Sequence, residues 1–226
     1  FTAFSGSHQD AINKCLALRG DEDAWDVAYL PIDPHDIGRT YQEVIRINSQ
    51  SGKGGVAYVL YRDHGYDLPR WLQIDFSGAV QHLAEQSEAE VASDQIHQLF
   101  CETYLNVPGA WSLGRYEVTK DDTEHQLAAV LGAGDGETPI QGRGTGVLDA
   151  FINAMEQVTG KNMVLVEYSE HTLGQSSDAE AVCYVQLNIE GARPCGVGRS
   201  NDIVQATLNA ILSALQGHCQ LTENAA

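Results

Sequence analysis

Apolar residues recur at two different spacings along the chain, and the spacing changes near residue 108. Before that point, residues 54–62, 69–86 and 93–105 place apolar side chains three and four positions apart, as one face of a helix does. After it, short apolar or alternating stretches lie between turn-forming clusters, which is typical of strands. The pattern therefore predicts a mostly helical part followed by an α+β part.

The α+β part reads as the same unit written twice. In each copy three predicted strands, joined by hairpins, precede one predicted helix, which gives two βββα units related by pseudo-two-fold symmetry, with the helices on one face of antiparallel sheets. The predicted strands are residues 111–120, 125–131, 137–142, 163–172, 179–189 and 193–198, and the predicted helices are residues 147–158 and 203–215.

Turn-forming residues also suggest where the chain divides. An N-terminal helix capped by Ser7 and an extended stretch with a short helix after Asp33 precede residues 41–48, whose periodicity fits a strand or a short helix equally well. We expect a first linker subdomain at residues 1–48, a three-helix subdomain at 49–108, the α+β domain at 109–219 and a frayed tail at 220–226.

A glycine motif opens each predicted helix of the α+β part. Residues 142–155 read GRGTGVLDAFINAM, and residues 196–211, about 54 positions later, read GVGRSNDIVQATLNAI. Two helix N-termini placed side by side would gather N–H groups and positive dipole ends, which suits a small carboxylate ligand. The alternative is that the glycines only permit a tight turn from strand to helix.

Composition excludes several classes of partner. The 226 residues carry 31 acidic and 13 basic side chains, a net charge of −18, which repels nucleic acids and anionic membrane surfaces. No apolar run approaches the roughly 18 residues that a membrane span needs, and no signal-peptide pattern opens the sequence. We expect neither a nucleic-acid nor a membrane partner.

Cysteine and histidine positions suggest a reduced protein without a metal of its own. The five cysteines are scattered and never form a C-x-x-C pair, which fits reduced thiols in the cytoplasm. The eight histidines show no H-x-x-x-H grouping. Residues 51–55, SGKGG, lack the first glycine and the final Ser or Thr of a phosphate-binding loop, so we expect no nucleotide site.

Four motifs in order resemble one enzyme family. Residues 5–12 (SGSHQDAI), 29–34 (YLPIDP) and 48–55 (NSQSGKGG), together with the duplicated glycine-helix unit, are similar to the C-terminal half of 2-isopropylmalate synthase, across essentially the whole chain. The chain starts at Phe1 in mid-pattern, and we expect it to be a fragment that lacks an N-terminal part.

The resemblance implies a larger enzyme. Its missing (β/α)8 barrel would use a divalent metal (Mg, Mn or Zn) to condense acetyl-CoA with 2-oxoisovalerate in leucine biosynthesis. The present fragment would hold no cofactor and would be inactive alone. It would form a homodimer and bind L-leucine for allosteric feedback inhibition.

The resemblance also assigns roles to particular residues. His8 and Tyr29 match residues that approach the active site of the partner subunit, where they suit proton transfer or carbonyl polarisation. Around the leucine site, the matching positions are Gly144 and Gly146 near the ligand backbone, Tyr168 in the pocket wall, Asp149 and Thr172 at neighbouring positions, and Asp202 in the second copy. Asp149 and Thr172 depart from the small apolar residues common in the family, and Asp202 can either cap its helix or hold the ligand ammonium.

Two other interpretations stay open at this point. The chain could be the regulatory part of a citramalate or homocitrate synthase, which would sense isoleucine or lysine instead. It could also be a stand-alone amino-acid-binding or oligomerisation module with no barrel. Titration with the three amino acids would separate the first alternative, and the parent reading frame would decide the second.

Overall fold

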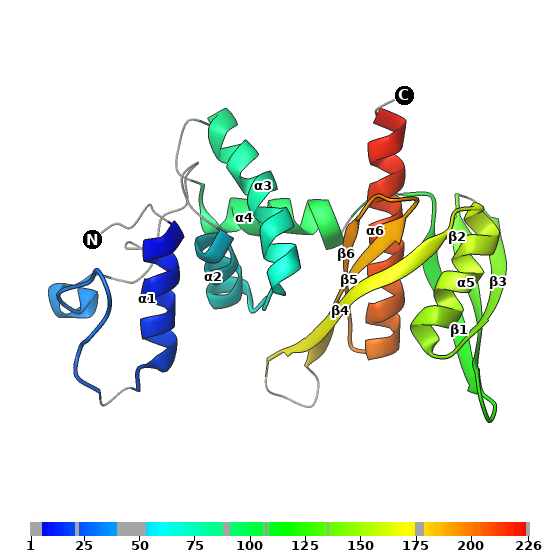
Figure 1. Cartoon of the computed structure of the whole chain (residues 1–226), viewed down its shortest axis with the longest axis horizontal. Helices are drawn as coiled ribbons and strands as arrows, with labels where there is room; N and C mark the ends of the chain where they lie inside the picture. Colours follow the sequence, from blue (N-terminus) through cyan, green and yellow to red (C-terminus); the bar gives the residue numbers. More distant parts are fainter. Residues whose placement is uncertain are drawn as a thin grey trace. The chain divides into compact units, whose positions relative to one another are not determined.

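The computed structural model in Figure 1 describes residues 6–20, 23–39, 53–87, 91–105, 107, 109–134, 136–174 and 179–224. The chain forms two compact units, Phe1–Phe100 and Cys101–Ala226, which are treated separately below. The segment 41–48, for which the sequence allowed a strand or a helix, lies outside the described residues. Within the described part, no helix combines the length and the apolar character needed to cross a bilayer.

Helices build the N-terminal unit. They are α1 (Gly6–Leu18), the 3₁₀ helix η1 (Pro34–Ile37), α2 (Lys53–His64), α3 (Arg70–Ser87) and α4 (Ser93–Phe100). Helix α2 packs against α1, α3 and α4, and Leu60, Leu72 and Ile96 are fully buried between them. Phe76 meets Phe100 edge to face at 5.4 Å between ring centroids, a favourable aromatic geometry.

The C-terminal unit contains two βββα repeats, as the sequence predicted. After the π-helical turn η3 (Cys101–Leu105), the first repeat is β1 (Ser112–Lys120), β2 (His125–Ala133), β3 (Gly136–Gly144) and α5 (Val147–Thr159). The second is β4 (Met163–Leu173), β5 (Glu180–Ile189), β6 (Cys195–Ser200) and α6 (Ile203–Asn224). Each repeat forms its own three-stranded antiparallel sheet, with β2 or β5 in the centre.

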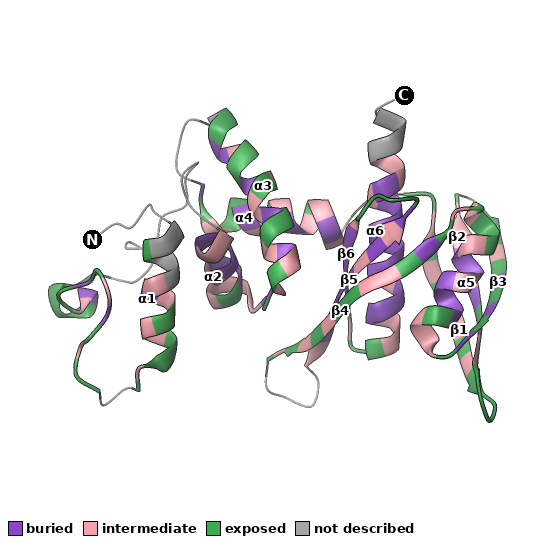
Figure 2. Ribbon diagram, viewed as in Figure 1, coloured by how far each residue is buried: buried purple, intermediate pink, exposed green. Residues whose placement is uncertain are grey.

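One apolar core joins the two repeats. It contains alternate residues of the central strands, such as Leu127 and Leu131 in β2 and Val185 and Leu187 in β5, together with the buried faces of both helices. Helix α5 packs on β3 of its own repeat and also on β4, while α6 packs on β6 and also on β1. This reciprocal packing is what a two-fold relation between the repeats requires, and Figure 2 shows α6 buried along most of its length.

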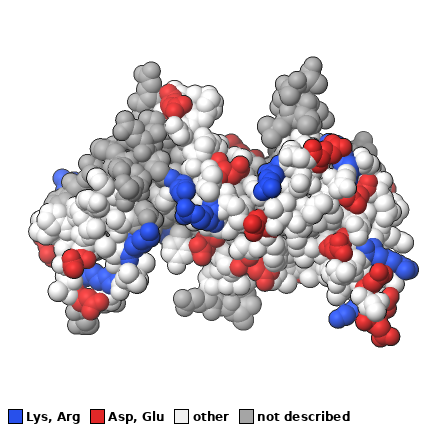
Figure 3. Space-filling model, viewed as in Figure 1, with Lys and Arg blue, Asp and Glu red and all other residues white. Residues whose placement is uncertain are grey.

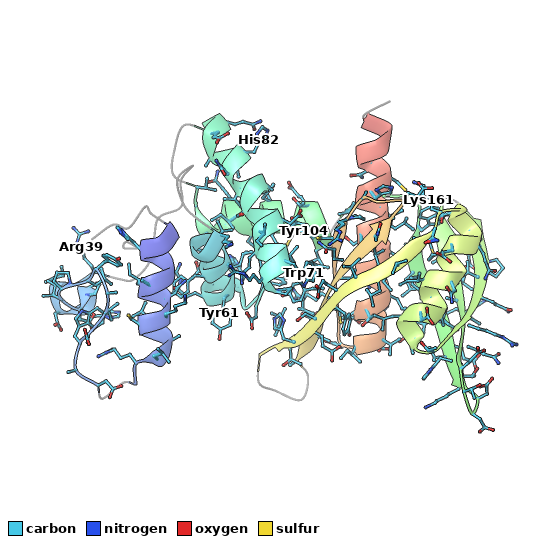
Figure 4. All side chains as sticks on the ribbon, in the orientation of Figure 1. Arg39, Tyr61, Trp71, His82, Tyr104 and Lys161 are labelled. Carbon is cyan, nitrogen blue, oxygen red and sulfur yellow. The ribbon has the colours of Figure 1, made fainter. Side chains whose placement is uncertain are left out.

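Two boundaries differ from the sequence expectation. The predicted helix 93–105 changes at Phe100 into the wider η3 turn, in which the carbonyl of Tyr104 (Figure 4) accepts a hydrogen bond from the hydroxyl of Ser213. Residues 220–224, expected in a frayed tail, continue α6. That helix is not interrupted at Gly217, where no proline or left-handed backbone stops it.

Acidic and basic side chains are interspersed over the viewed face of the molecule (Figure 3). Both signs gather at the tip of the β1–β2 hairpin, which carries Lys120, Asp121, Asp122 and Glu124. Asp121 organises this turn, because its side chain accepts hydrogen bonds from the backbone N–H groups of Thr123 and Glu124 at 3.1 and 2.9 Å.

Candidate functional site

His8 and Tyr29, which are 21 positions apart in the sequence, lie in contact in the N-terminal unit. Their rings stack with centroids 4.0 Å apart and an angle of 28° between the planes. His8 is exposed near the start of α1, and Tyr29 is 61% exposed. The structure therefore brings together the two residues that the sequence linked only through a family resemblance.

A tight turn holds Tyr29 out toward solvent. Val27 and Leu30 are buried on either side of it and form an isolated bridge, in which the Leu30 N–H donates to the Val27 carbonyl at 3.1 Å. Tyr29 has φ of 65°, a left-handed conformation that is uncommon for a residue with a side chain. Strained backbone of this kind is often found at functional sites, where surrounding contacts maintain it.

Two further contacts fix this turn. The indole N–H of Trp25 donates to the Leu30 carbonyl at 2.7 Å, and the Ala28 N–H lies 3.5 Å from the Cys15 sulfur of α1. Because Cys15 and His8 are on the same helix, α1 controls both sides of the aromatic pair. The pair is thus positioned by packing and backbone hydrogen bonds, while both rings remain accessible.

In the first repeat, the predicted glycines surround the start of α5. A Cβ at Gly144 would lie 2.5 Å from the Ala150 nitrogen and 2.7 Å from Asp149 Oδ2, so no side chain fits there. Gly146 occupies the N-cap, and among the described residues no side chain caps this helix. Asp149 turns back instead, and its Oδ2 accepts from the N–H and hydroxyl of Thr145 at 2.9 and 3.2 Å.

In the second repeat, Asp202 caps α6. Its Oδ1 accepts from the N–H groups of Val204 and Gln205 at 2.9 and 3.3 Å, which is the capping role the sequence allowed. Its Oδ2 accepts a hydrogen bond from the Tyr116 hydroxyl of the first repeat. The bond from Tyr116 lowers the pKa of Asp202, and burial together with this carboxylate raises the pKa of Tyr116 to about 12.

Strand pairing shows that the repeats are 56 positions apart, not the 54 that the aligned glycines suggested. Leu127 pairs with Gly142, and Cys183, 56 residues after Leu127, pairs with Gly198, 56 residues after Gly142. On the same register Gly146 corresponds to Asp202, so both are the residues at which a helix begins. The two G-x-G motifs are therefore offset by two residues in space.

This register explains what the glycines do. A Cβ at Gly142 would collide with the Ala150 carbonyl, and a Cβ at the equivalent Gly198 would collide with the Ala206 carbonyl. Both glycines thus let a helix lie directly on its strand. Gly196 adds a second such position in the longer α6, where the first repeat has Ile140.

Tyr168 lies on β4, the strand that packs against α5. It is 37% exposed, and its hydroxyl donates to the Glu170 carboxylate and lies 3.2 Å from the Thr207 hydroxyl. Burial and the nearby Glu170 charge raise the pKa of Tyr168. Thr172, two strand positions beyond Glu170, is exposed and pairs with Ala181.

Two residues at these helix starts were not identified from the sequence. Tyr116 was assigned only to a strand, and Thr207 only to a helix, because neither belongs to a recognisable motif. The signal was available only through pairing: Tyr116 pairs with Ala129 and Tyr168 with Val185, which makes the two tyrosines equivalent.

A separate groove of about 640 Å³ lies on the first repeat, and none of its lining residues was predicted as a site residue. Polar side chains on β2, β3 and α5 line it, among them Gln126, Gln141, Arg143 and Asn153. Over the residues that the structure describes, no three His, Cys, Asp or Glu side chains gather as a metal site.

Two family models match the chain in consecutive segments. One, described as alpha-isopropylmalate synthase, post-catalytic domain-like, matches residues 1–61. The other, described as the LeuA allosteric (dimerisation) domain, matches residues 90–218, which is more than half of the chain.

Similar proteins carry one name. A 2-isopropylmalate synthase of Alcanivorax borkumensis is 45% identical over 218 residues, covering 95% of this chain and 39% of that protein. That of Rhizobium meliloti is 46% identical over 220 residues, with 95% and 39% covered. That of Mycobacterium leprae is 43% identical over 228 residues, with 95% and 37% covered. The chain thus spans about two fifths of the length of these relatives.

Proposed function

The chain belongs to the LeuA allosteric (dimerisation) domain family, and from this premise we propose that it is the C-terminal regulatory part of a 2-isopropylmalate synthase. The whole enzyme condenses acetyl-CoA with 2-oxoisovalerate in a separate metal-dependent barrel. This part binds leucine, forms a homodimer and passes the binding signal to the barrel. The order of the two matched segments and the shared name of the relatives support the proposal.

One observation carries the leucine site: the two equivalent helix starts differ in what they offer to a ligand. At α6 the Asp202 carboxylate already accepts two N–H groups and the Tyr116 hydroxyl. At α5 the equivalent residue is Gly146, which supplies no carboxylate. A free amino acid would bring its own carboxylate to the first turn of α5, with Tyr168 of the adjacent β4 in the place that Tyr116 holds.

The remaining groups of leucine can also be accommodated near this helix. The Asp149 carboxylate is exposed close to the α5 start and is suited to the ligand ammonium, whereas Asp202 is engaged elsewhere. Val147 and Leu148 are partly buried beside the common core and offer an apolar surface. Burying a leucine side chain contributes about 2 kcal/mol.

Calorimetric titration of the chain with leucine tests this function. We expect saturable leucine binding that Tyr168→Phe weakens about tenfold, the effect of losing a hydrogen bond to a charged group. Tyr116→Phe is the matched control, since it alters the equivalent tyrosine of the other repeat and should leave leucine affinity unchanged. Absence of leucine binding to the wild-type chain would contradict the proposal.

The same titration with other amino acids addresses the alternatives. Tighter binding of isoleucine or lysine than of leucine would favour a citramalate or homocitrate synthase. A parent reading frame that lacks a barrel would instead indicate a stand-alone module.

Ligand binding would act on the enzyme through a change of population. Leucine inhibits if it binds one arrangement of the regulatory domains more tightly than the other, so that the N-terminal unit presents His8 and Tyr29 differently to the barrel of the partner subunit. The stacked, exposed pair is suited to this role because both rings remain free to meet a substrate.

A further inference from the structure

Tyr116 and Tyr168 occupy equivalent positions, yet their hydroxyl groups bind in different places. Each follows an irregularity in the first strand of its repeat, and each pairs with the corresponding residue of the central strand. The Tyr116 hydroxyl crosses to the other repeat and donates to Asp202. The Tyr168 hydroxyl stays within its own repeat, close to Glu170, Thr207 and Cys183.

The polar groups around Tyr168 replace apolar residues of the first repeat. On the common register, Cys183 corresponds to Leu127 and Thr207 to Phe151, and Glu170, which pairs with Cys183, corresponds to Val118, which pairs with Leu127. Thr207 is 3% exposed and Cys183 is fully buried. Polar atoms at such core positions require hydrogen-bond partners, and here they satisfy one another.

The contacts form one connected network. The Thr207 hydroxyl lies 3.2 Å from the Cys183 sulfur and 2.9 Å from the Ile203 carbonyl, and the Tyr168 hydroxyl completes it at 3.2 Å from Thr207 and 3.8 Å from Cys183. The network holds the Tyr168 hydroxyl away from α5, although β4 packs against that helix as β1 packs against α6.

We propose that Thr207, Cys183 and Glu170 form a resting position for the Tyr168 hydroxyl, which the effector must displace before Tyr168 can bind its carboxylate. This inference rests on the proposed leucine site. Tyr168 then alternates between its own repeat and the α5 start, whereas Tyr116, bonded to Asp202, stays in the crossed position. The resting position lowers effector affinity by the fraction of chains that it occupies, so these three residues set the sensitivity of the response.

Thr207→Val tests the proposal because it removes one hydroxyl and keeps the side-chain shape. We expect leucine to bind about fivefold more tightly to this variant, the effect of one ordinary hydrogen bond. The effect should vanish in the Tyr168→Phe background, since that protein has no hydroxyl to hold. Glu170→Gln, at an exposed position, should also tighten binding.

Thr159→Val is the matched control. Thr159 also donates to the carbonyl four residues before it in a helix, at 2.8 Å, but it lies at the end of α5 without a printed contact to Tyr168 among the described residues. Its replacement should leave leucine affinity unchanged. An unchanged affinity in Thr207→Val, or a Thr207→Val effect that persists with Tyr168→Phe, would overturn the proposal.

The resting position can also be examined without leucine. In chain labelled with ¹³C at the tyrosine Cζ, the Tyr168 resonance should move in Thr207→Val and stay in place in Thr159→Val. A Tyr168 resonance that is insensitive to Thr207→Val would overturn the resting position. A resonance that moves, in a chain that binds no leucine, would support the resting position and contradict the leucine site.

Discussion

Single side chains in this protein are held by short, specific contacts that allow direct tests. Asp63 in the N-terminal unit shows this most clearly. Its two oxygens accept from Nε and a terminal nitrogen of Arg62 at 2.6 and 2.7 Å, and Oδ2 also accepts from the Ser93 hydroxyl at 2.6 Å. These bonds lower the pKa of Asp63 from 3.8 to about 2, and the hydrogen bond from Arg62 is the main cause.

The depressed pKa of Asp63 predicts a pH dependence of stability. A carboxyl with a lower pKa in the folded state stabilises the fold above its unfolded pKa, and the stabilisation is lost as the pH falls from about 4 toward 2. Urea unfolding at pH 5 and at pH 2.5 should therefore show a larger loss of stability for the wild type than for Asp63→Asn. Equal losses in the two proteins would mean that Asp63 does not contribute.

At the residue scale, the sequence was informative only where a motif repeated or resembled a family. His8 and Tyr29 were identified by resemblance, and their contact follows from a turn whose left-handed residue no local pattern marks, since left-handed backbone usually carries glycine. Thr207 and Cys183 could not be found, because a lone Thr or Cys in an apolar helix or strand resembles any other core residue.

At the scale of helices and strands, the contact of α5 with β3 and of α6 with β6 depends on the absence of side chains at defined glycines. At Gly142 and Gly198 an added Cβ would overlap a helix carbonyl, which cannot move without shifting the helix. Backbone on both sides of the contact leaves no flexible group to absorb the overlap.

Gly142→Ala should therefore destabilise the C-terminal unit by about 1–3 kcal/mol. Gly217→Ala in α6 is the control, because a Cβ there meets no atom within 4 Å among the described residues, and alanine is the better helix former. Thermal unfolding should give a lower melting temperature for the first variant and an equal or higher one for the second. A Gly142→Ala protein as stable as the wild type would show that the helix can move away at no cost.

Most element types were predictable, because strand alternation and helical spacing are both strong in the repeats. The order βββα was confirmed twice, and most predicted ends lie within two residues of the observed ones. The relation between the repeats was less accessible. Aligning Gly144 with Gly198 matches letters, whereas the sheet places Gly142 opposite the position equivalent to that of Gly198, and only hydrogen-bond register reveals this.

At the scale of the whole molecule, the N-terminal unit holds the His8–Tyr29 pair and the C-terminal unit holds the proposed effector site. If the first contributes to chemistry and the second to regulation, a change in one should spare the function of the other. The two activities can therefore be measured separately.

In the full-length enzyme, His8→Ala should lower turnover about a hundredfold, the typical contribution of a group that transfers a proton. Leucine affinity of the same variant should equal that of the wild type. His35→Ala, at an exposed histidine of the same unit, serves as the control and should retain normal turnover. Full turnover in His8→Ala would exclude His8 from the reaction.

The hydrogen bonds between Asp202, Tyr116 and the first turn of α6 have a consequence for dose and response. One of two matching positions in each chain is filled by the protein's own carboxylate, so a chain has a single vacancy for a dissolved amino acid. A lone vacancy fills along a hyperbola, with a Hill coefficient of about one. Any sigmoidal inhibition curve must therefore arise from communication between chains.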